Sequence, residues 1–343
     1  MAEKAKDGIT HTIYEAKKLL RHFYKTQTPT LLWGAPGIGK SDSFKQLAAE
    51  MNVGLIDIRA GTKLPEDFTG IPVPDLEKRV AVWLKANFWP DVKRNGPKGI
   101  LVFDEITDTS KPVQSVLYRV ILDRMISEDE KLPEGWWPVG AGNRRSDRAA
   151  AQAFSTALAN RFAHIHVEPD PEAFVRWALS QDFMGHLVPG FIKFRPNLLH
   201  SMEGADLFAF PSPRTWAQVA RNIEDCEPEM MLKVVAALVG DGAAGEFAAY
   251  MRTIDLPDLD DIVANPSKCK IPKEPSSKYA LSCMLARYMA RDNIDKIMIY
   301  VRRTDFGKDF EIATVWDATK RDTSLTETKA FTDFANRNAD MQL

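Results

Sequence analysis

The sequence is poor in cysteine, in net charge and in long hydrophobic runs, and each shortage excludes a class of protein. Its three cysteines, Cys226, Cys269 and Cys283, are widely spaced and odd in number. They form neither a disulfide framework nor a recognisable metal site, which suits a reducing cytoplasm. No run of about 18 apolar residues occurs, so nothing is predicted to span a membrane. Residues 1–7 lack the apolar core of a signal peptide, and we expect a cytoplasmic protein.

The charge balance argues against a protein that binds nucleic acid non-specifically. The formal net charge is −2 over 343 residues, and the nearest local basic cluster is Arg144, Arg145 and Arg148. Non-specific nucleic-acid binding depends on a basic surface, so nucleic acid is not the expected partner. The length exceeds one typical core and predicts two or three domains. Apolar content of 45% and charged content of 27% are typical of a globular protein.

Residues 34–41 read Gly-Ala-Pro-Gly-Ile-Gly-Lys-Ser and match the P-loop pattern in full. Gly34 and Gly39 permit backbone conformations that turn successive N–H groups toward a phosphate. Lys40 adds a positive charge for the β- and γ-phosphates, and the Ser41 hydroxyl can bind Mg²⁺. We therefore expect ATP to be held by Gly34, Ala35, Pro36, Gly37, Ile38, Gly39, Lys40, Ser41 and Asp42.

The context of this motif favours the P-loop over a glycine-rich surface turn. Residues 30–33 read as a short buried strand, and Phe44, Leu47, Ala48 and Met51 recur at helical spacing. Further strands are predicted at 54–58, 99–103, 137–141 and 162–167, with helices at 11–25 and 112–125. Strands that alternate with helices predict a parallel sheet covered on both faces.

An acidic pair, Asp104 and Glu105, follows the apolar run 99–103 directly. A carboxylate at the end of a parallel strand faces the crevice where open α/β sheets bind ligands. Asp104 is predicted to hold Mg²⁺ opposite Ser41, and Glu105 to orient the attacking water. The alternative is a solvated acidic pair that caps the next helix.

Two further residues lie at predicted strand ends. The Asn143 amide could hydrogen-bond a water or a γ-phosphate oxygen, although asparagine is also common in Gly-Asn turns. Arg161 precedes the last strand and could neutralise a transferring phosphoryl group, often across a subunit boundary. A surface salt bridge is the alternative for Arg161.

The motifs in this order resemble those of the AAA+ ATPases, and more closely the MoxR-type branch related to the CbbQ, NorQ and GvpN groups. The resemblance covers about residues 10–220. It includes Walker A at 34–41, Walker B at 103–105, sensor 1 at Asn143, the arginine finger at Arg161 and sensor 2 at Arg214. The segments 64–70, 112–117 and 211–214 resemble stretches specific to the branch.

The resemblance implies an α/β P-loop NTPase core with a five-stranded parallel sheet, a smaller helical lid and assembly into a ring, usually a hexamer. It assigns residues 1–168 to the core, with a helix-2 insertion near 68–88, and residues 169–255 to the lid. Residues 256–343 form an extension that the resemblance does not cover. Arg161 would reach a neighbour's nucleotide, and Arg214 would close the lid on its own. Such proteins remodel protein complexes, commonly with a von Willebrand A-domain partner.

Several interpretations stay open at this point. Residues 79–84 alternate in polarity and fit either a projecting hairpin that touches a client or an ordinary edge strand. His164 and His166 lie two residues apart on a predicted strand, and the lack of an evident third ligand favours core or interface histidines over a metal site. The alternative functions are a nucleic-acid motor or loader and a nucleotide-binding scaffold without turnover.

Overall fold

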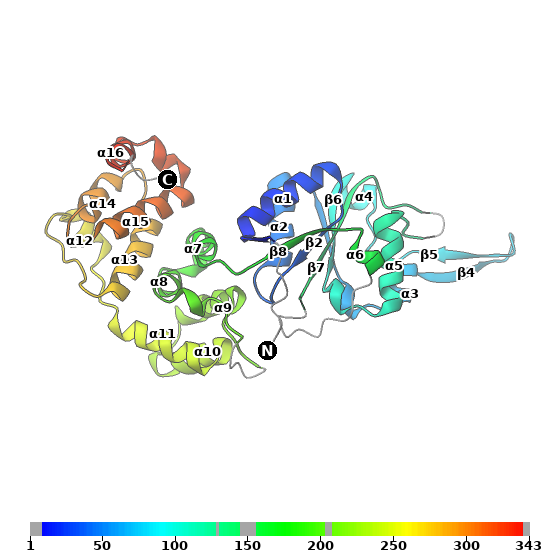
Figure 1. The fold of residues 1–343 in the computed structure, drawn as a ribbon, viewed down its shortest axis with the longest axis horizontal. Coiled ribbons are helices and arrows are strands. Elements are labelled where there is room, and N and C mark those ends of the chain that lie inside the picture. The colour runs from blue at the N-terminus through cyan, green and yellow to red at the C-terminus, as the bar shows by residue number, and fades with distance from the viewer. Residues whose placement is uncertain (1–8, 128–129, 145–155, 203–207, 339–343) are drawn as a thin grey trace. The chain divides into compact units, whose positions relative to one another are not determined.

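A computed structural model describes residues 9–127, 130–144, 156–202 and 208–338. It divides into two compact units, Met1–Pro169 and Asp170–Leu343. The first unit is an α/β unit and the second is helical (Figure 1). Among the described residues, every helix is too short or too polar to cross a bilayer.

The first unit is built on a six-stranded sheet in the order β1-β8-β2-β7-β6-β3, and all of its strand pairs are parallel. The strands are β1 (Thr10–His11), β2 (Thr30–Trp33), β3 (Gly54–Arg59), β6 (Lys98–Asp104), β7 (Gly135–Gly142) and β8 (Ala163–Val167). The predicted parallel sheet is confirmed, with β1 as a sixth strand at its edge. A two-residue strand shows no periodicity in the sequence, so only its pairing with β8 reveals it.

Helices cover both faces of this sheet. They are α1 (Ile13–Thr26), α2 (Lys40–Met51), α3 (Pro65–Thr69), α4 (Val92–Asn95), α5 (Lys111–Leu122) and α6 (Thr156–Ala159). One core packs α1 and α2 against Leu32, Val102 and Val139, and the other packs α3, α5 and α6 against Leu31 and Phe103. Because both faces are buried, the central strands are apolar throughout, as β6 shows.

A separate antiparallel hairpin, β4 (Ile71–Asp75) with β5 (Val80–Leu84), extends away from the rest of the first unit (Figure 1). The hairpin interpretation of residues 79–84 is therefore correct, and the edge-strand alternative is wrong. Gly70 begins the hairpin with φ +84°, and a Cβ there would lie 2.0 Å from the Leu84 carbonyl oxygen. Only glycine fits this entry to the hairpin.

The second unit contains ten described helices around one hydrophobic core. They are α7 (Pro171–Leu179), α8 (Leu187–Phe194), α9 (Pro213–Ile223), α10 (Pro228–Val239), α11 (Asp241–Thr253), α12 (Leu259–Ala264), α13 (Pro275–Tyr288), α14 (Ile294–Val301), α15 (Lys308–Arg321) and α16 (Lys329–Arg337). The core runs from Phe174 to Phe334 and so joins the segment predicted as a lid to the segment predicted as an extension. The division of this unit at residue 255 stays a prediction.

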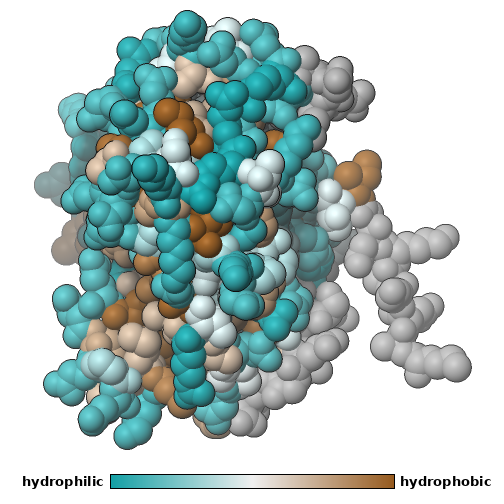
Figure 2. Space-filling view, turned by 90° about the vertical axis from the view of Figure 1, so that its left-hand side faces the viewer, coloured by the Kyte–Doolittle hydropathy of each residue, from teal (hydrophilic) through white to brown (hydrophobic). Residues whose placement is uncertain are grey.

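The apolar segment 279–300 is helical on both sides of a break, because α13 ends at Tyr288 and α14 begins at Ile294. The Asn293 amide causes the break: it donates to the Tyr288 carbonyl (3.1 Å) and accepts from the Ala290 N–H (2.8 Å). The segment 255–275, which is rich in proline and aspartate, contains α12, which Asp258 caps. The face of this unit in Figure 2 is mostly hydrophilic, with hydrophobic side chains in small separate patches.

Candidate nucleotide site

The carboxyl ends of three neighbouring strands bring the predicted nucleotide-site residues together. Strands β2, β7 and β6 lie side by side and parallel, so the loops that follow them open at the same edge. Lys40 Nζ donates to Asn143 Oδ1 at 2.9 Å, and Ser41 Oγ donates to Asp104 Oδ2 at 2.7 Å. Residues from three separate motifs are therefore in direct contact.

The phosphate loop has the backbone geometry that its glycines require. Gly39 precedes α2 with φ +92°, and a Cβ there would meet nothing within 4 Å. Its conformation, rather than crowding, selects glycine. At Gly34 a Cβ would lie 2.6 Å from the Val167 carbonyl oxygen, so close packing selects glycine there. The first turn of α2 has no side-chain cap, which leaves its N–H groups and its positive dipole end for an anion.

Lys40 lies inside this loop with 8% of its surface exposed. Its ammonium group also donates to the carbonyl oxygens of Gly34 (2.7 Å) and Ala35 (2.9 Å). These contacts hold a positive charge at the centre of the loop. A burial this deep is unusual for lysine and is tolerated because its donors are satisfied.

The other predicted loop residues have different surroundings. Ile38 is buried in the core with α1 and α2, whereas Pro36 and Gly37 are partly exposed. The Asp42 carboxylate is 65% exposed and lies 3.7 Å from the Lys45 ammonium. Asp42 is thus the most exposed side chain of the predicted set.

The Ser41–Asp104 pair supplies the ligands that Mg²⁺ prefers, a hydroxyl and a carboxylate oxygen. The second Asp104 oxygen accepts from the Glu105 N–H at 2.9 Å, which fixes the orientation of the carboxylate. Burial raises the pKa of Asp57 on the adjacent strand β3, and the Asp104 carboxylate raises it further. The residues present therefore fit a magnesium ion.

Glu105 has a left-handed backbone, with φ +55° and ψ +33°. This region is uncommon for any residue other than glycine, and strain of this kind costs on the order of 1–3 kcal/mol. The short helical turn 106–108 follows it directly, so Glu105 does stand at the start of a turn. Its side chain makes no capping hydrogen bond to that turn, and the next α-helix, α5, has Ser110 and not an acidic residue at its N-cap.

Asn143 faces the site rather than serving only a turn. Its side-chain oxygen accepts from Lys40, and its N–H donates to the Thr107 hydroxyl at 3.1 Å. Thr107 is buried, and its methyl group fills the space beside Gly142, where a Cβ would lie 2.4 Å away. Sequence reasoning missed Thr107 because a single threonine after an acidic pair has no distinguishing pattern.

Arg161 lies exposed in the turn between α6 and β8. Its guanidinium carbon lies 5.8 Å from the centre of the Tyr118 ring, and Nη2 donates to the Tyr118 hydroxyl at 3.4 Å. Within the described part of the chain no carboxylate pairs with Arg161, so the salt-bridge alternative finds no support. Tyr118 on α5 was missed because its role depends on a contact 43 residues away.

Arg214 lies in the second unit, in the first turn of α9. Ser212 begins this helix with a capping box, since its hydroxyl accepts from the Thr215 N–H and the Thr215 hydroxyl accepts from the Ser212 N–H. A cation near a helix N-terminus is opposed by the helix dipole, typically by 0.3–1 kcal/mol. Arg214 is exposed, and its predicted action on the nucleotide stays a prediction.

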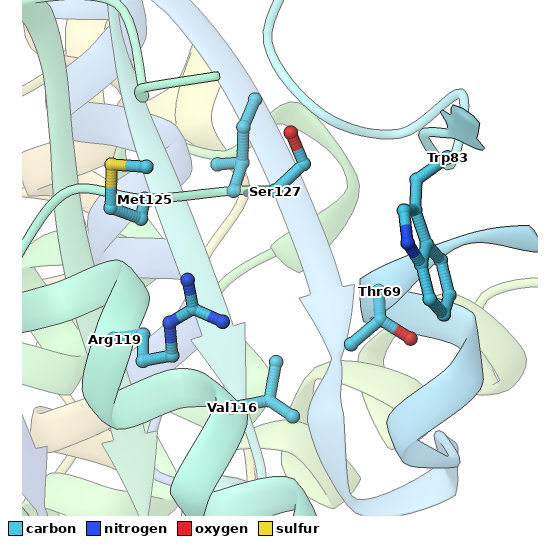
Figure 3. Close-up of a pocket in the computed structure, with 7 residues that line it drawn as sticks. Thr69, Trp83, Val116, Arg119, Met125 and Ser127 are labelled. Carbon is cyan, nitrogen blue, oxygen red and sulfur yellow. The ribbon is translucent and has the colours of Figure 1, made fainter. Parts of the chain in front are cut away.

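A pocket of about 240 Å³ lies elsewhere in the first unit, where α3, β5 and α5 meet (Figure 3). Its lining includes Thr69, Trp83 and Arg119. None of the predicted nucleotide-site residues lines this pocket. A search for groups of three or more His, Cys, Asp or Glu side chains that could hold a metal ion finds none among the described residues, including around the two histidines of β8.

Comparison with known proteins agrees with this geometry. Residues 30–167 match the model of the family described as ATPase family associated with various cellular activities (AAA). The parallel sheet, the P-loop and this match together show a P-loop NTPase fold in the first unit, where residues 30–167 are similar to AAA ATPase domains. No curated protein gives a significant match.

Solved structures resemble the chain only distantly. NtrX from Brucella abortus, solved with ADP, is 13% identical, with a TM-score of 0.43 over 99% of this chain and 70% of that one. The Holliday junction branch migration motor RuvB from Thermotoga maritima is 17% identical, with a TM-score of 0.37 over 75% of each chain. Both TM-scores are under 0.5, so the assignment depends on the family match and on the site itself.

Proposed function

We propose that the chain is an AAA+ ATPase of the MoxR type that hydrolyses ATP with Mg²⁺ to remodel or activate a protein complex. The observation that carries the proposal is the contact of Lys40 with Asn143 and of Ser41 with Asp104 at one edge of a parallel sheet. These residues come from three motifs that are far apart in the sequence. Their convergence is what phosphoryl transfer needs and what a structural loop would not require.

Each residue has a distinct task in this proposal. The loop amides and the Lys40 ammonium bind the phosphates, and Ser41 and Asp104 hold the metal ion. Mg²⁺, held by these two residues, would neutralise negative charge on the phosphates. Glu105 orients and polarises the attacking water, and Asn143 holds it or a γ-phosphate oxygen by its amide.

The proposal includes assembly into a homo-oligomeric ring, with the hexamer that is usual in the branch as the expected form. Arg161 supports this part, because its guanidinium is exposed and has no carboxylate partner in the described part of the chain. In this proposal the Arg161 guanidinium contacts the nucleotide of a neighbouring subunit. Arg214 would act in the same way on the nucleotide of its own subunit.

A protein client is favoured by the hairpin β4–β5. Ile71, Val80 and Leu84 are 69%, 52% and 59% exposed, and Leu76 at the tip is 84% exposed. An exposed apolar strand pair is suited to contact another polypeptide, whereas nucleic-acid binding requires a basic surface. A von Willebrand A-domain protein is the proposed class of partner.

The proposal is tested by steady-state ATP hydrolysis and nucleotide binding. Lys40→Ala should bind nucleotide poorly, and Glu105→Gln should bind ATP normally but lose at least about 100-fold in kcat. The exposed residues Lys25 and Glu66 provide matched controls, and Lys25→Ala and Glu66→Gln should behave as wild type.

Three outcomes would contradict the proposal. Unchanged ATP affinity in Lys40→Ala would place the phosphates elsewhere, and wild-type turnover in Glu105→Gln would remove Glu105 from the mechanism. Absence of turnover under all conditions would favour a nucleotide-binding scaffold. Strong stimulation by DNA would favour a nucleic-acid motor.

A further inference from the structure

Trp33 is the last residue of β2, and the phosphate loop begins at the next residue, Gly34. Its indole ring stacks on two histidines of the neighbouring strand β8. The ring centres lie 5.9 Å from His164 and 6.2 Å from His166, with interplanar angles of 28° and 15°. The loop strand and β8 are therefore joined by side chains as well as by their backbone pairing.

Hydrogen bonds fix the protonation state of His164. The indole N–H of Trp33 can only donate, and it lies 2.8 Å from His164 Nδ1, so Nδ1 carries no proton. The carbonyl oxygen of Ala159 can only accept, and it lies 2.9 Å from Nε2, so Nε2 carries the proton. Only the neutral imidazole with its proton on Nε2 makes both bonds at once. His164 thus bridges the indole N–H of Trp33 and the carbonyl oxygen of Ala159.

The second group belongs to the turn that carries Arg161. The Ala159 carbonyl oxygen also accepts from the Phe162 N–H at 3.1 Å, and the Arg161 N–H donates to the Leu158 carbonyl at 3.1 Å. The hydrogen bond from His164 is therefore made to the Ala159 carbonyl, which also accepts the backbone hydrogen bond across the turn that contains Arg161. A continuous chain of contacts runs from the residue before Gly34 to this turn.

We propose that His164 is a positioning residue that couples the phosphate loop to Arg161 through Trp33 and the Ala159 carbonyl. The proposal rests on the function proposed above, in which Arg161 acts on the nucleotide of a neighbouring subunit. The bridge holds the Arg161 turn in one place relative to the loop of the same subunit. Nucleotide binding at one site is thereby linked to the action of this subunit's Arg161 on the nucleotide of its neighbour. This link would couple adjacent sites of the ring.

The test is an epistasis experiment on the full chain under conditions where it assembles. His164→Leu removes both hydrogen bonds, and we expect a fall in kcat of about tenfold, a fraction of the 10³–10⁵ that an arginine finger supplies. Nucleotide affinity should change less than about twofold, because Lys40 and the loop amides are untouched. In the Arg161→Ala background, His164→Leu should produce no further loss of kcat.

Conservative variants separate this role from a structural one. His164→Gln offers a carbonyl acceptor and an N–H donor on one amide, and it should recover a large part of kcat. Trp33→Phe keeps an aromatic ring but lacks the indole N–H, so it should lower kcat and, combined with His164→Leu, lower it no further. The exposed His22 on α1 is the matched control, and His22→Leu should leave kcat unchanged.

The outcomes distinguish this inference from the proposed function. If Arg161→Ala lowers kcat and His164→Leu does not, the bridge has no role and the proposal fails. The same conclusion follows if His164→Leu lowers kcat equally in the presence and in the absence of Arg161, or if His164→Gln recovers nothing. If Arg161→Ala itself leaves kcat unchanged, the function assigned to Arg161 fails first and the coupling falls with it.

Discussion

At the scale of single residues, Glu105 combines the proposed role in orienting water with a strained backbone. Its φ of +55° places it in the left-handed region, which costs an L-residue roughly 1–2 kcal/mol. The chain retains a glutamate where glycine would be easier to accommodate. We attribute this to a chemical requirement for the carboxylate, since strain at functional sites is offset by the surrounding structure.

This strain predicts that glycine at position 105 gives a more stable protein than alanine, the reverse of the usual order. Replacing glycine by alanine ordinarily stabilises a protein by 0.4–1 kcal/mol, but alanine is strained where φ is positive. Glu105→Gly should therefore be more stable than Glu105→Ala by about 1 kcal/mol, and neither variant should turn over ATP. Urea denaturation gives the difference directly. The matched control is Lys18, which is exposed in the middle of α1. There Lys18→Ala should be more stable than Lys18→Gly by about 1 kcal/mol, because alanine is the better helix former.

An observed advantage of alanine at position 105 would contradict the strained conformation. The comparison of two small residues matters here, because both remove the carboxylate and its contacts. The difference between them reports the backbone alone.

The site shows which single residues the sequence can predict. The loop 34–41, Asp104 and Asn143 were predicted because each follows a recognisable strand, and the parallel order of the strands brings their ends together. The structure shows that Lys40 contacts Asn143 and that Ser41 contacts Asp104, whereas the nucleotide, metal and catalytic roles given to all the site residues, Asp42 and Arg161 included, stay predictions. The contact of Tyr118 with Arg161 and that of His164 with Trp33 join residues distant in sequence, so no local pattern marks them.

At the scale of elements, an ion-pair cluster links α1 to α2, the helix that begins at the phosphate loop. Lys17 on α1 donates to the Glu50 carboxylate of α2 at 2.9 Å, and Arg21 also pairs with it. Burial acts to raise the pKa of Glu50, but the hydrogen bonds from Lys17 and Arg21 outweigh it, and the pKa is lowered. The ionised form is therefore favoured in the folded protein.

This lowered pKa predicts a pH dependence of stability with a definite sign. A carboxyl whose pKa is lower when folded stabilises the protein above its unfolded pKa, and the contribution is lost as the pH falls through the folded pKa. Glu50 is 38% exposed, so its contribution at pH 7 is expected to be less than about 1 kcal/mol. Glu50→Gln should be slightly less stable than wild type at neutral pH and equal to it near pH 3.

Thermal or urea unfolding measured across this pH range checks the prediction. High salt should also reduce the difference, because partly exposed charges are screened. Glu77 in the hairpin tip makes no ion pair with another described residue, so Glu77→Gln should show no such pH dependence. A difference for Glu50→Gln that persists at pH 3 would mean that the cluster does not act through ionisation.

Element boundaries show a second limit of sequence reasoning. Residues 279–300 are apolar with helical spacing, and that period continues through the break between α13 and α14. The hydrogen bonds of a single amide, that of Asn293, end the first helix. Periodicity reports which face is buried and does not report where side chains compete with the backbone.

At the scale of the whole molecule, the chain consists of two units whose division falls at Pro169 and Asp170. The boundary after residue 168 that the resemblance implies lies one residue before this division. The resemblance covers only about residues 10–220, so it does not reach residue 255, where the second unit was expected to divide. The packing beyond that point was not accessible from motifs.

Packing ties the two predicted parts of the second unit closely together. A Cβ on Gly190 of α8 would lie 2.8 Å from the Ala280 Cα of α13, so these helices approach at backbone distance. Lys193 of α8 and Asp317 of α15 form an ion pair with side chains only 17% and 13% exposed. Breaking a buried pair by removing one partner typically costs 3–5 kcal/mol.

These contacts predict that the segment 170–255 does not fold without the rest of the unit. Truncation after residue 255 removes large buried side chains from the core, namely Ile262, Leu281, Leu285, Tyr300 and Phe306. Burial of each contributes about 1.5–3 kcal/mol, so the combined loss is on the order of the 5–15 kcal/mol that stabilises a typical domain. Limited proteolysis of the truncated chain should therefore remove residues 170–255 rapidly and leave a fragment that ends near residue 169. Full-length protein under the same protease should keep the second unit intact, because its core is complete. A protease-resistant 170–255 segment would instead establish a lid that folds on its own, with residues 256–343 as a true extension.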